Sequence, residues 1–305
     1  MRRTNSRYWP VSIAALMSLA GCSMQQLAVR SVGDMLSSGT SVYETDDDPE
    51  LIAEALPFSL TLIDSLLAQQ PENRNLLLAG ARGYLLYGRA FVGIPADEAR
   101  FDDFEHALEL RQRARGLYLR AFAYASRALE LDYPGLVAAL HEQPEEALIR
   151  VDQPLRDVPT LYWTAASLGL AISSARNDAA LLARLPEVDA MLQRALALDE
   201  AWSDGALHEF AISLAGAEPV PADPAVLDAH YERAIQLAAG SRAGVYLTFA
   251  EAVAIPKQDR KQFSELLSHA LAVDVAAHPE QRLLNIVAQR HARWLLDHAD
   301  DLFLE

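Results

Sequence analysis

The sequence predicts an all-α fold in which helical hairpins are stacked into a solenoid. Apolar residues recur at spacings of three and four along almost the whole chain, which is the spacing that places side chains on one face of an α-helix. The sequence lacks sustained alternation of apolar and polar residues, the pattern that would indicate β-strands. A short apolar motif, called the recurring phrase below, also recurs at intervals that suit one helical hairpin per repeat.

The recurring phrase is clearest in 192–199, where apolar residues form a helical stripe that ends at an aspartate. A second helix is expected to begin almost at once, near Gly205-Ala206-Leu207, where small residues let two backbones approach closely. Copies of the phrase put an alanine at positions 128, 195, 234 and 270, so successive copies lie 67, 39 and 36 residues apart. Tetratricopeptide repeats have a period of about 34 residues, which loops lengthen. These intervals predict degenerate tetratricopeptide-like repeats; the alternative is chance recurrence in an Ala/Leu-rich helical protein.

Acidic residues and prolines mark where the helices begin. In Asp48-Pro49-Glu50 the aspartate accepts from free backbone N–H groups, the proline loses no hydrogen bond, and the glutamate lies at the positive end of the helix dipole. Similar starts follow at Pro71-Glu72, Pro144-Glu145, Pro186-Glu187, Asp223-Pro224 and Pro279-Glu280. The expected helices span 50–69, 72–92, 98–131, 135–141, 144–150, 160–175, 178–184, 186–198, 203–214, 224–238, 242–253, 259–273 and 279–303.

The first 21 residues predict a lipoprotein signal peptide. Three arginines precede an apolar run, 11–20, that is too short to span a bilayer. Leu19-Ala20-Gly21-Cys22 matches the pattern of small residues before a lipidated cysteine, and Cys22 is the one cysteine of the chain. We expect a diacylglycerol and acyl lipid on Cys22 to anchor the mature protein. The next residue, Ser23, favours export, so the body is expected on the periplasmic side of the outer membrane.

Three segments follow from this reading: a signal peptide at 1–21, a lipidated tether at 22–48 and a helical domain at 49–305. The acids at 46–48 lack the alternating spacing of a calcium loop, so helix capping is the better interpretation. The formal charge of the chain is −16, and it becomes −19 without 1–21, because that segment carries three arginines and no acid. Such an acidic chain, without a basic stripe, disfavours a nucleic-acid partner.

Two helical segments combine small residues with aromatic side chains. Glycines recur within 76–93, although each weakens a helix by up to about 1 kcal/mol, so close helix packing or another gain must offset them. Segment 161–169 likewise sets small residues beside large rings. The two interpretations are ordinary tight packing and an aromatic-lined cavity or groove inside the solenoid. The second makes five aromatic residues candidates for ligand or partner binding: Tyr84, Tyr87, Phe91, Tyr162 and Trp163.

The sequence carries no pattern that is typical of catalysis or metal binding. Its eight histidines form no H-E-x-x-H pair, and neither G-x-S-x-G nor the phosphate-binding G-x-x-x-x-G-K occurs. Thiol chemistry is excluded because lipid occupies Cys22. We therefore expect a protein that is not an enzyme, with no metal site and no cofactor besides the lipid on Cys22.

Five short blocks, together with the lipobox at Cys22, carry a family resemblance. They are Asp47-Asp48-Pro49-Glu50-Leu51-Ile52-x-Glu54-Ala55-Leu56-Pro57, Leu161-Tyr162-Trp163, Gly205-Ala206-Leu207-His208, Tyr246-x-x-x-Ala250-Glu251 and Ala292-Arg293-Trp294-Leu295-Leu296. With these blocks in this order, the chain resembles the T component of tetratricopeptide-protein-associated TRAP transporters. The resemblance covers about residues 43–303, and none of the blocks is a catalytic signature.

The resemblance implies a periplasmic lipoprotein, a homotrimer, with a pore or cavity through each protomer. It also implies a TRAP-type periplasmic substrate-binding protein as partner, and small hydrophobic ligands as cargo. The residues that it carries over to this chain as candidate site residues are Tyr162, Trp163, His208, Tyr246 and Trp294. The expected function is that of an auxiliary component of a TRAP-type uptake system. The alternative is a general outer-membrane tetratricopeptide scaffold for envelope assembly.

Overall fold

The computed structural model describes residues 42–216 and 222–304, and within these ranges every regular element is a helix. The predicted all-α class is therefore confirmed. The signal peptide, Cys22 and the tether up to residue 41 lie outside the described residues, so the predictions made for them stay predictions.

The helices of the first half run from Val42 to Ser173. They are α2 (Val42–Thr45), α3 (Pro49–Gln69), α4 (Arg74–Gly88), the π-helical η1 (Arg89–Gly93), α5 (Ile94–Ala99), α6 (Phe104–Asp132), α7 (Leu136–Glu142), α8 (Pro144–Ala147), the 3₁₀-helical η2 (Leu148–Arg150) and α9 (Pro154–Ser173).

The helices of the second half are shorter. They are α10 (Ala179–Leu182), α11 (Leu185–Asp199), the 3₁₀-helical η3 (Trp202–Gly205), α12 (Ala206–Ala215), α13 (Pro224–Ala238), α14 (Ala243–Phe249), the π-helical η4 (Ala250–Ala254), α15 (Arg260–Ala272), the 3₁₀-helical η5 (Pro279–Gln281), α16 (Arg282–Asp297) and α17 (Ala299–Leu302).

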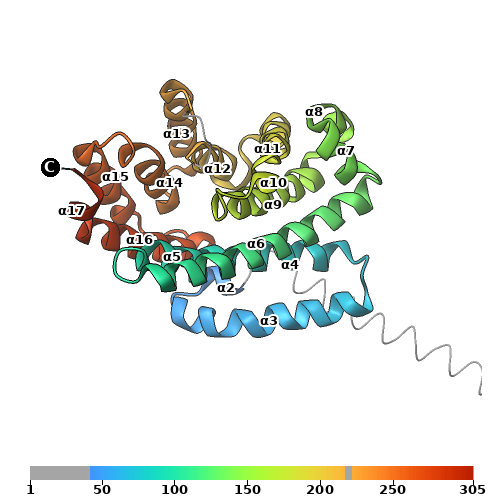
Figure 1. Ribbon diagram of the computed structural model, residues 1–305, viewed down its shortest axis with the longest axis horizontal. Helices are drawn as coiled ribbons and strands as arrows, with labels where there is room; N and C mark the ends of the chain where they lie inside the picture. Colours follow the sequence, from blue (N-terminus) through green and yellow to red (C-terminus); the bar gives the residue numbers. More distant parts are fainter. Residues whose placement is uncertain (1–41, 217–221, 305) are drawn as a thin grey trace, which may run out of the picture.

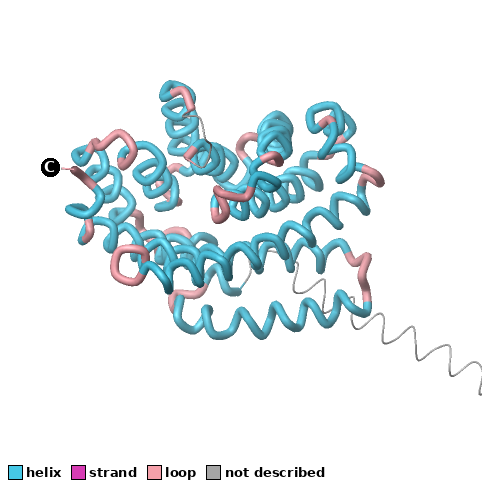
Figure 2. The backbone as a smooth tube through the Cα atoms, in the orientation of Figure 1, coloured by secondary structure: helices cyan, strands magenta, loops and turns pink. Residues whose placement is uncertain are grey.

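Most neighbours in the chain are neighbours in space. Helix α3 lies at the outer edge, with α4 and then α6 packed behind it, and α9 and α11 follow in the same order (Figures 1 and 2). In the second half α12 packs on α13 and α14, while α14 packs on α15 and α16. The arrangement of these pairs as regular tetratricopeptide-like repeats stays a prediction.

The last long helix returns to the start of the domain. Helix α16 packs against α2 and α3, where Arg282 Nη1 donates to the Thr45 carbonyl oxygen at 3.2 Å and Arg290 is ion-paired with Glu50. In an open solenoid each unit contacts only its immediate neighbours. Here the contact between the two ends closes the helices into a ring. Residues 42–45, expected in the tether, form part of that contact.

Helix capping explains two differences from the expected boundaries. The expected helix 98–131 is divided, because Asp103 caps α6 by accepting from the His106 N–H at 3.0 Å, so the chain turns at 100–103. The expected helix 160–175 begins earlier, at Pro154. The carboxylate of Asp157 accepts from the Gln153 N–H at 2.8 Å, and this bond satisfies a donor at the start of α9.

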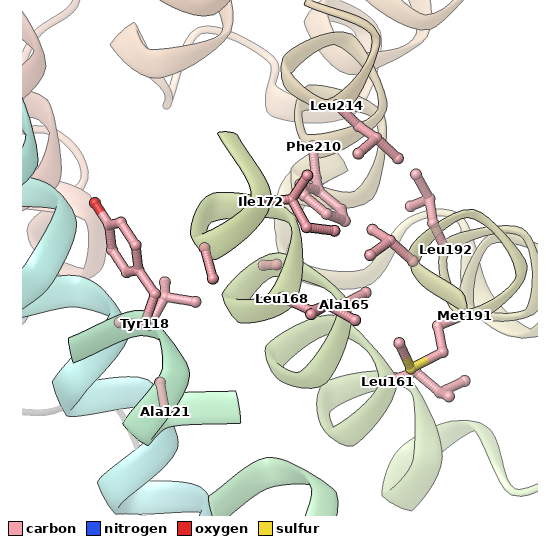
Figure 3. Packing of buried hydrophobic residues seen from close by; sticks show 14 of the residues in the cluster. Tyr118, Ala121, Leu161, Ala165, Leu168, Ile172, Met191, Leu192, Phe210 and Leu214 are labelled. Carbon is pink, nitrogen blue, oxygen red and sulfur yellow. The ribbon is translucent and has the colours of Figure 1, made fainter. Parts of the chain in front are cut away.

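The main core lies where α6, α9, α11 and α12 converge. Figure 3 shows Leu161, Leu168 and Ile172 of α9 between Tyr118 of α6 and Met191 of α11. All three α9 side chains have no accessible surface. Burying such a side chain contributes roughly 1.5–3 kcal/mol, so the apolar face of α9 is a main source of stability.

The glycines of α4 let other helices approach closely, as tight packing predicts. A Cβ on Gly83 would lie 2.6 Å from Leu60 Cδ2, and a Cβ on Gly88 would lie 2.9 Å from Tyr118 Cε1. Tyr118 is held there because its hydroxyl donates to the Gly88 carbonyl at 3.2 Å. The glycine run is therefore a packing surface on which α3 and α6 rest.

Replacing Gly88 by alanine is expected to destabilise the protein by about 1–3 kcal/mol, because the new methyl group collides with the buried ring of Tyr118. The matched control is Gly116→Ala in α6, where nothing lies within 4 Å of the added Cβ, and where the better helix propensity of alanine should stabilise by up to about 1 kcal/mol. Urea unfolding of both variants measures the two effects. A lower free energy of unfolding for Gly88→Ala together with a higher one for Gly116→Ala would support the packing role. Stabilisation of both variants would contradict it.

Candidate functional site

Two adjoining cavities lie inside the ring of helices. Cavity A, with a volume of about 400 Å³, lies between α4, η1, α9, α12, α14, η4 and α16. Cavity B, with a volume of about 250 Å³, lies between α2, α3, α4, η1, α9 and α16. Small-molecule sites typically occupy about 300–1,000 Å³, so cavity A is large enough for a ligand by itself.

Two residues that line cavity A, Arg89 and Glu251, belong to a group of paired charges. We call this group the acid–base cluster, and its other members, Asp97, Glu98 and His291, lie behind the lining. Arg89 Nη1 donates to Asp97 Oδ2 at 2.9 Å, and Arg89 Nη2 lies 3.9 Å from Glu251 Oε2. The two nitrogens of His291 lie 2.8 Å from Glu98 Oε1 and 3.2 Å from Glu251 Oε1. The cluster thus joins η1 and α5 to η4 and α16.

The geometry holds the cluster in its charged form. Burial opposes protonation of His291, but the hydrogen bonds to Glu251 and Glu98 outweigh it and raise the pKa of His291 to about 9. Burial likewise opposes ionisation of Glu251, but His291 and Arg89 outweigh it and lower the pKa of that carboxyl. At neutral pH an imidazolium is therefore enclosed between two carboxylates.

A second charged pair lines cavity A. Arg242 donates from Nη2 and Nε to Glu209 Oε2, at 2.6 and 3.1 Å. A Cβ on Gly244 would lie 2.5 Å from Glu209 Oε1, so the glycine leaves room for this carboxylate. Tyr162 also lines the cavity, and burial raises the pKa of its hydroxyl to about 12. The tyrosine therefore keeps its proton and can donate a hydrogen bond at neutral pH.

Two π-helical segments carry charged residues into cavity A. Arg89 is the first residue of η1 and Glu251 the second residue of η4. Each segment is followed by an Ile-Pro pair, and the sequences are Val92-Gly93-Ile94-Pro95 and Val253-Ala254-Ile255-Pro256. Proline has no N–H and collides with the carbonyl four residues earlier, so the preceding turn widens to i→i+5 bonding. π-Helical turns are frequent at functional sites.

The two Val-x-Ile-Pro stretches were a detectable signal that our sequence reading did not use. They stand at equivalent places after the two π-helical segments. The helix continues past Pro95 into α5, whereas it ends at Ala254, shortly before Pro256. Periodicity alone reads each proline as a helix end and shows nothing of the widened turn before it. It therefore misses that Arg89 and Glu251 point to the same space.

Cavity B is lined mainly by apolar side chains. Phe91 and Trp163 contribute rings, and leucines of α3, α4 and α16 also line it. Its charged lining residues, Arg82 and Glu44, are paired with each other. The guanidinium of Arg82 also lies 5.9 Å from the centre of the Trp163 ring. Cavity B therefore presents little unpaired charge.

Three of the eight predicted aromatic and histidine site residues line a cavity: Tyr162 in cavity A, and Phe91 and Trp163 in cavity B. Two more lie in the core beside them. Tyr84 donates its hydroxyl to Asp64 Oδ2 at 2.7 Å, and the Tyr87 ring packs 5.8 Å from the ring of Phe91. A ligand-binding role for these residues stays a prediction.

The other three predicted site residues line neither cavity. His208 Nδ1 lies 2.9 Å from Nδ1 of His230 on α13. Tyr246 stacks on His269 with ring centres 5.5 Å apart, and Trp294 stacks on the His298 ring at 4.0 Å. These packing contacts link α12 to α13, α14 to α15, and successive turns at the end of α16.

Among the described residues, no group of three or more His, Cys, Asp or Glu side chains is arranged to hold a metal ion. In the same ranges, α3 is the one helix whose length and composition would allow it to cross a membrane. Its inner face packs on α4, and a single helix of this kind is weak evidence for a membrane span.

Raising the pH from 6.5 to above 9 is expected to destabilise the protein. The pKa of His291 is about 9 in the folded protein and near 6.5 in the unfolded chain, so its stabilisation is complete below pH 6.5 and disappears as the pH rises through 9. At about 1.4 kcal/mol per pKa unit, the loss is roughly 3 kcal/mol. Urea unfolding at pH 6.5 and 9.5 measures it.

The comparison variant for this pH effect is His291→Gln, which should be less stable than the wild type at pH 6.5 and should show a smaller fall between the two pH values. Surface groups titrate in both proteins, so the difference between the two falls isolates His291. Identical falls would show that this histidine does not hold its second proton.

Comparison with known proteins identifies the family of the chain. It is similar to an uncharacterized protein of Treponema pallidum (strain Nichols), to which it is 32% identical over 323 aligned residues that cover all of both chains. Residues 45–303 match the family described as TRAP transporter T-component. This is a family of transport accessory components rather than of enzymes. The match spans nearly the whole described part of the chain, and the protein therefore belongs to the TRAP transporter T-component family.

Proposed function

We propose that this protein is a lipid-anchored auxiliary of a TRAP-type uptake system, which docks a periplasmic substrate-binding protein and receives small hydrophobic ligands in its cavities. The observation that carries the proposal is the coincidence of the family match over 45–303 with cavities A and B at the centre of that same region. A ring of helices around cavities that are partly open to solvent suits a protein that holds a ligand during transfer.

The anchor and the assembly complete the proposal. Lipid on Cys22 attaches the protein to the periplasmic side of the outer membrane, and the tether places the helical ring beside soluble periplasmic partners. Three copies associate into a homotrimer, as the family resemblance implies. The protein carries out no chemistry on its ligand, which agrees with the paired, charge-balanced side chains in cavity A.

Affinity capture tests the docking role. The tagged Cys22→Ala form, expressed in the periplasm of its own host, is expected to retain a TRAP-type substrate-binding protein in stoichiometric amount, identified by mass spectrometry. A tagged periplasmic protein of similar charge serves as the control for ionic adsorption, because the chain without residues 1–21 has a formal charge of −19.

Two outcomes of the capture decide between the proposed functions. Recovery of the binding protein, and loss of uptake of a TRAP substrate when the gene is deleted, would support the transport role. Recovery of outer-membrane assembly factors alone, with unchanged uptake, would favour an envelope scaffold. Light scattering on the purified Cys22→Ala protein without its partner is expected to give three times the protomer mass.

A further inference from the structure

The two cavities are chemically different and share a boundary. Leu86, Ala90 and Leu284 line both cavities, so these three side chains stand where cavity A meets cavity B. All three are partly accessible, although they lie inside the ring. An apolar boundary between a charged cavity and an apolar one suits a molecule with a polar end and an apolar end.

Arg89 offers free hydrogen-bond donors close to this boundary. It is the neighbour of Ala90, and 33% of its side chain is accessible because it faces cavity A. A guanidinium has five N–H donors, but among the described residues Arg89 donates one hydrogen bond, from Nη1 to Asp97. At 3.9 Å, Glu251 is too far from Nη2 to accept one. Nε and Nη2 can therefore bind a further acceptor.

The charge around Arg89 admits an anionic group. Glu251 is neutralised on its other side by the protonated ring of His291, which it contacts at 3.2 Å. Arg242 and Glu209 neutralise each other on the opposite part of the wall. Asp97, the carboxylate that Arg89 bonds, also lies 3.9 Å from Arg111, so its charge is shared between two guanidinium groups. An oxyanion at Arg89 would gain a charge-assisted hydrogen bond from Nε or Nη2, whereas a cationic group there would be repelled by the guanidinium and gain no hydrogen bond from it.

On the other side of the boundary, cavity B offers an apolar lining. Leu56, Leu60 and Ile63 of α3 line it together with Leu78 of α4, and Trp163 adds a ring. A hydrocarbon chain that enters this space from the boundary meets carbon along most of its length. Each buried methylene contributes about 0.8 kcal/mol, so the chain end of a ligand supplies much of its affinity.

We propose that cavities A and B together bind a single-chain amphiphile with an oxyanion head group, carboxylate or phosphate, whose head is held by Arg89 and whose alkyl chain passes Leu86 and Leu284 into cavity B. The inference rests on the proposed function only in taking the cavities as the site of the cargo. It names the class of that cargo and the residues that select it.

Titration calorimetry with n-alkyl carboxylates tests the path of the chain. The Cys22→Ala protein, freed of lipid on a hydrophobic resin, is titrated with hexanoate, octanoate, decanoate and dodecanoate. The affinity is expected to rise up to about fourfold per methylene, which is the 0.8 kcal/mol of methylene burial converted to a ratio. The variants Leu284→Trp on α16 and Ala90→Leu on η1 place larger side chains at the boundary. In these variants the affinity should stop rising beyond the shorter alkyl carboxylates.

The matched control for the path is Leu155→Trp, the same substitution at a residue that is 96% exposed and lines neither cavity. It is expected to keep the wild-type rise. Two narrowing variants are used so that one misfolded protein does not decide the result, and circular dichroism checks both. A rise with chain length that is the same in wild type and both narrowing variants would overturn the proposed path.

Head-group comparison at fixed chain length tests the role of Arg89. Decanoate or decyl phosphate is expected to bind the wild type at least tenfold more tightly than decyltrimethylammonium does, and Arg89→Gln should lose that preference while Arg89→Lys keeps most of it. Preference for decanoate points to a fatty acid and preference for decyl phosphate to a phospholipid-derived ligand. Equal binding of all three would overturn the head-group assignment.

Capture of the substrate-binding protein by the same variants separates the two proposals. If Leu284→Trp and Arg89→Gln retain the partner but no amphiphile binds the wild type, the cargo assignment fails and the docking role stands. If amphiphiles bind as expected but no TRAP-type partner is captured, the ligand site stands and the docking role fails.

Discussion

The contact of α16 with the first helices of the domain is the constraint on which the rest of the structure depends. Without it, the helices would form an open array, and the space that they enclose would be a groove in the surface. The enclosed imidazolium of His291 is part of that constraint, because it bonds α16 to Glu98 of α5 and to Glu251 of η4. The ring of His291 is fully buried and makes both bonds, whereas its two glutamate partners are each 29% accessible. The histidine therefore links three elements at a point that water does not reach.

Two widened turns, η1 and η4, contribute lining residues to the centre of the ring. In a uniform α-helix the side chains on adjacent turns would fill the space, but the widened turns η1 and η4 displace the following residues around the helix axis. Each widened turn is a consequence of a proline two residues beyond it, Pro95 or Pro256, whose missing N–H breaks the regular ladder. Local backbone chemistry therefore shapes a cavity that hydrophobic burial by itself would tend to fill.

Sequence reasoning could reach the all-α class and most helix starts, because these depend on residues close together in the chain. Asp48 and Asp103 cap helices by hydrogen bonds that span three residues. The glycine run of α4 could also be read as a packing surface. The acid–base cluster could not be predicted in this way, since Glu98 and His291 are 193 residues apart and meet only when the ring closes. Periodicity shows which face of a helix is apolar, but it does not show which distant helix covers that face.

Two tyrosines, Tyr84 and Tyr162, show why a site is harder to predict than a fold. Tyr84 and Tyr162 look alike in the sequence, since each stands in a helix beside small residues. In the structure the hydroxyl of Tyr84 is bound by Asp64 and contributes to packing, whereas Tyr162 lines cavity A. What separates the two is the space around the ring, and that space is set by helices from the other half of the chain. An aromatic side chain becomes a candidate for binding a ligand only where packing leaves one of its sides uncovered. A binding residue is therefore recognised from the cavity that it lines, and not from its residue type.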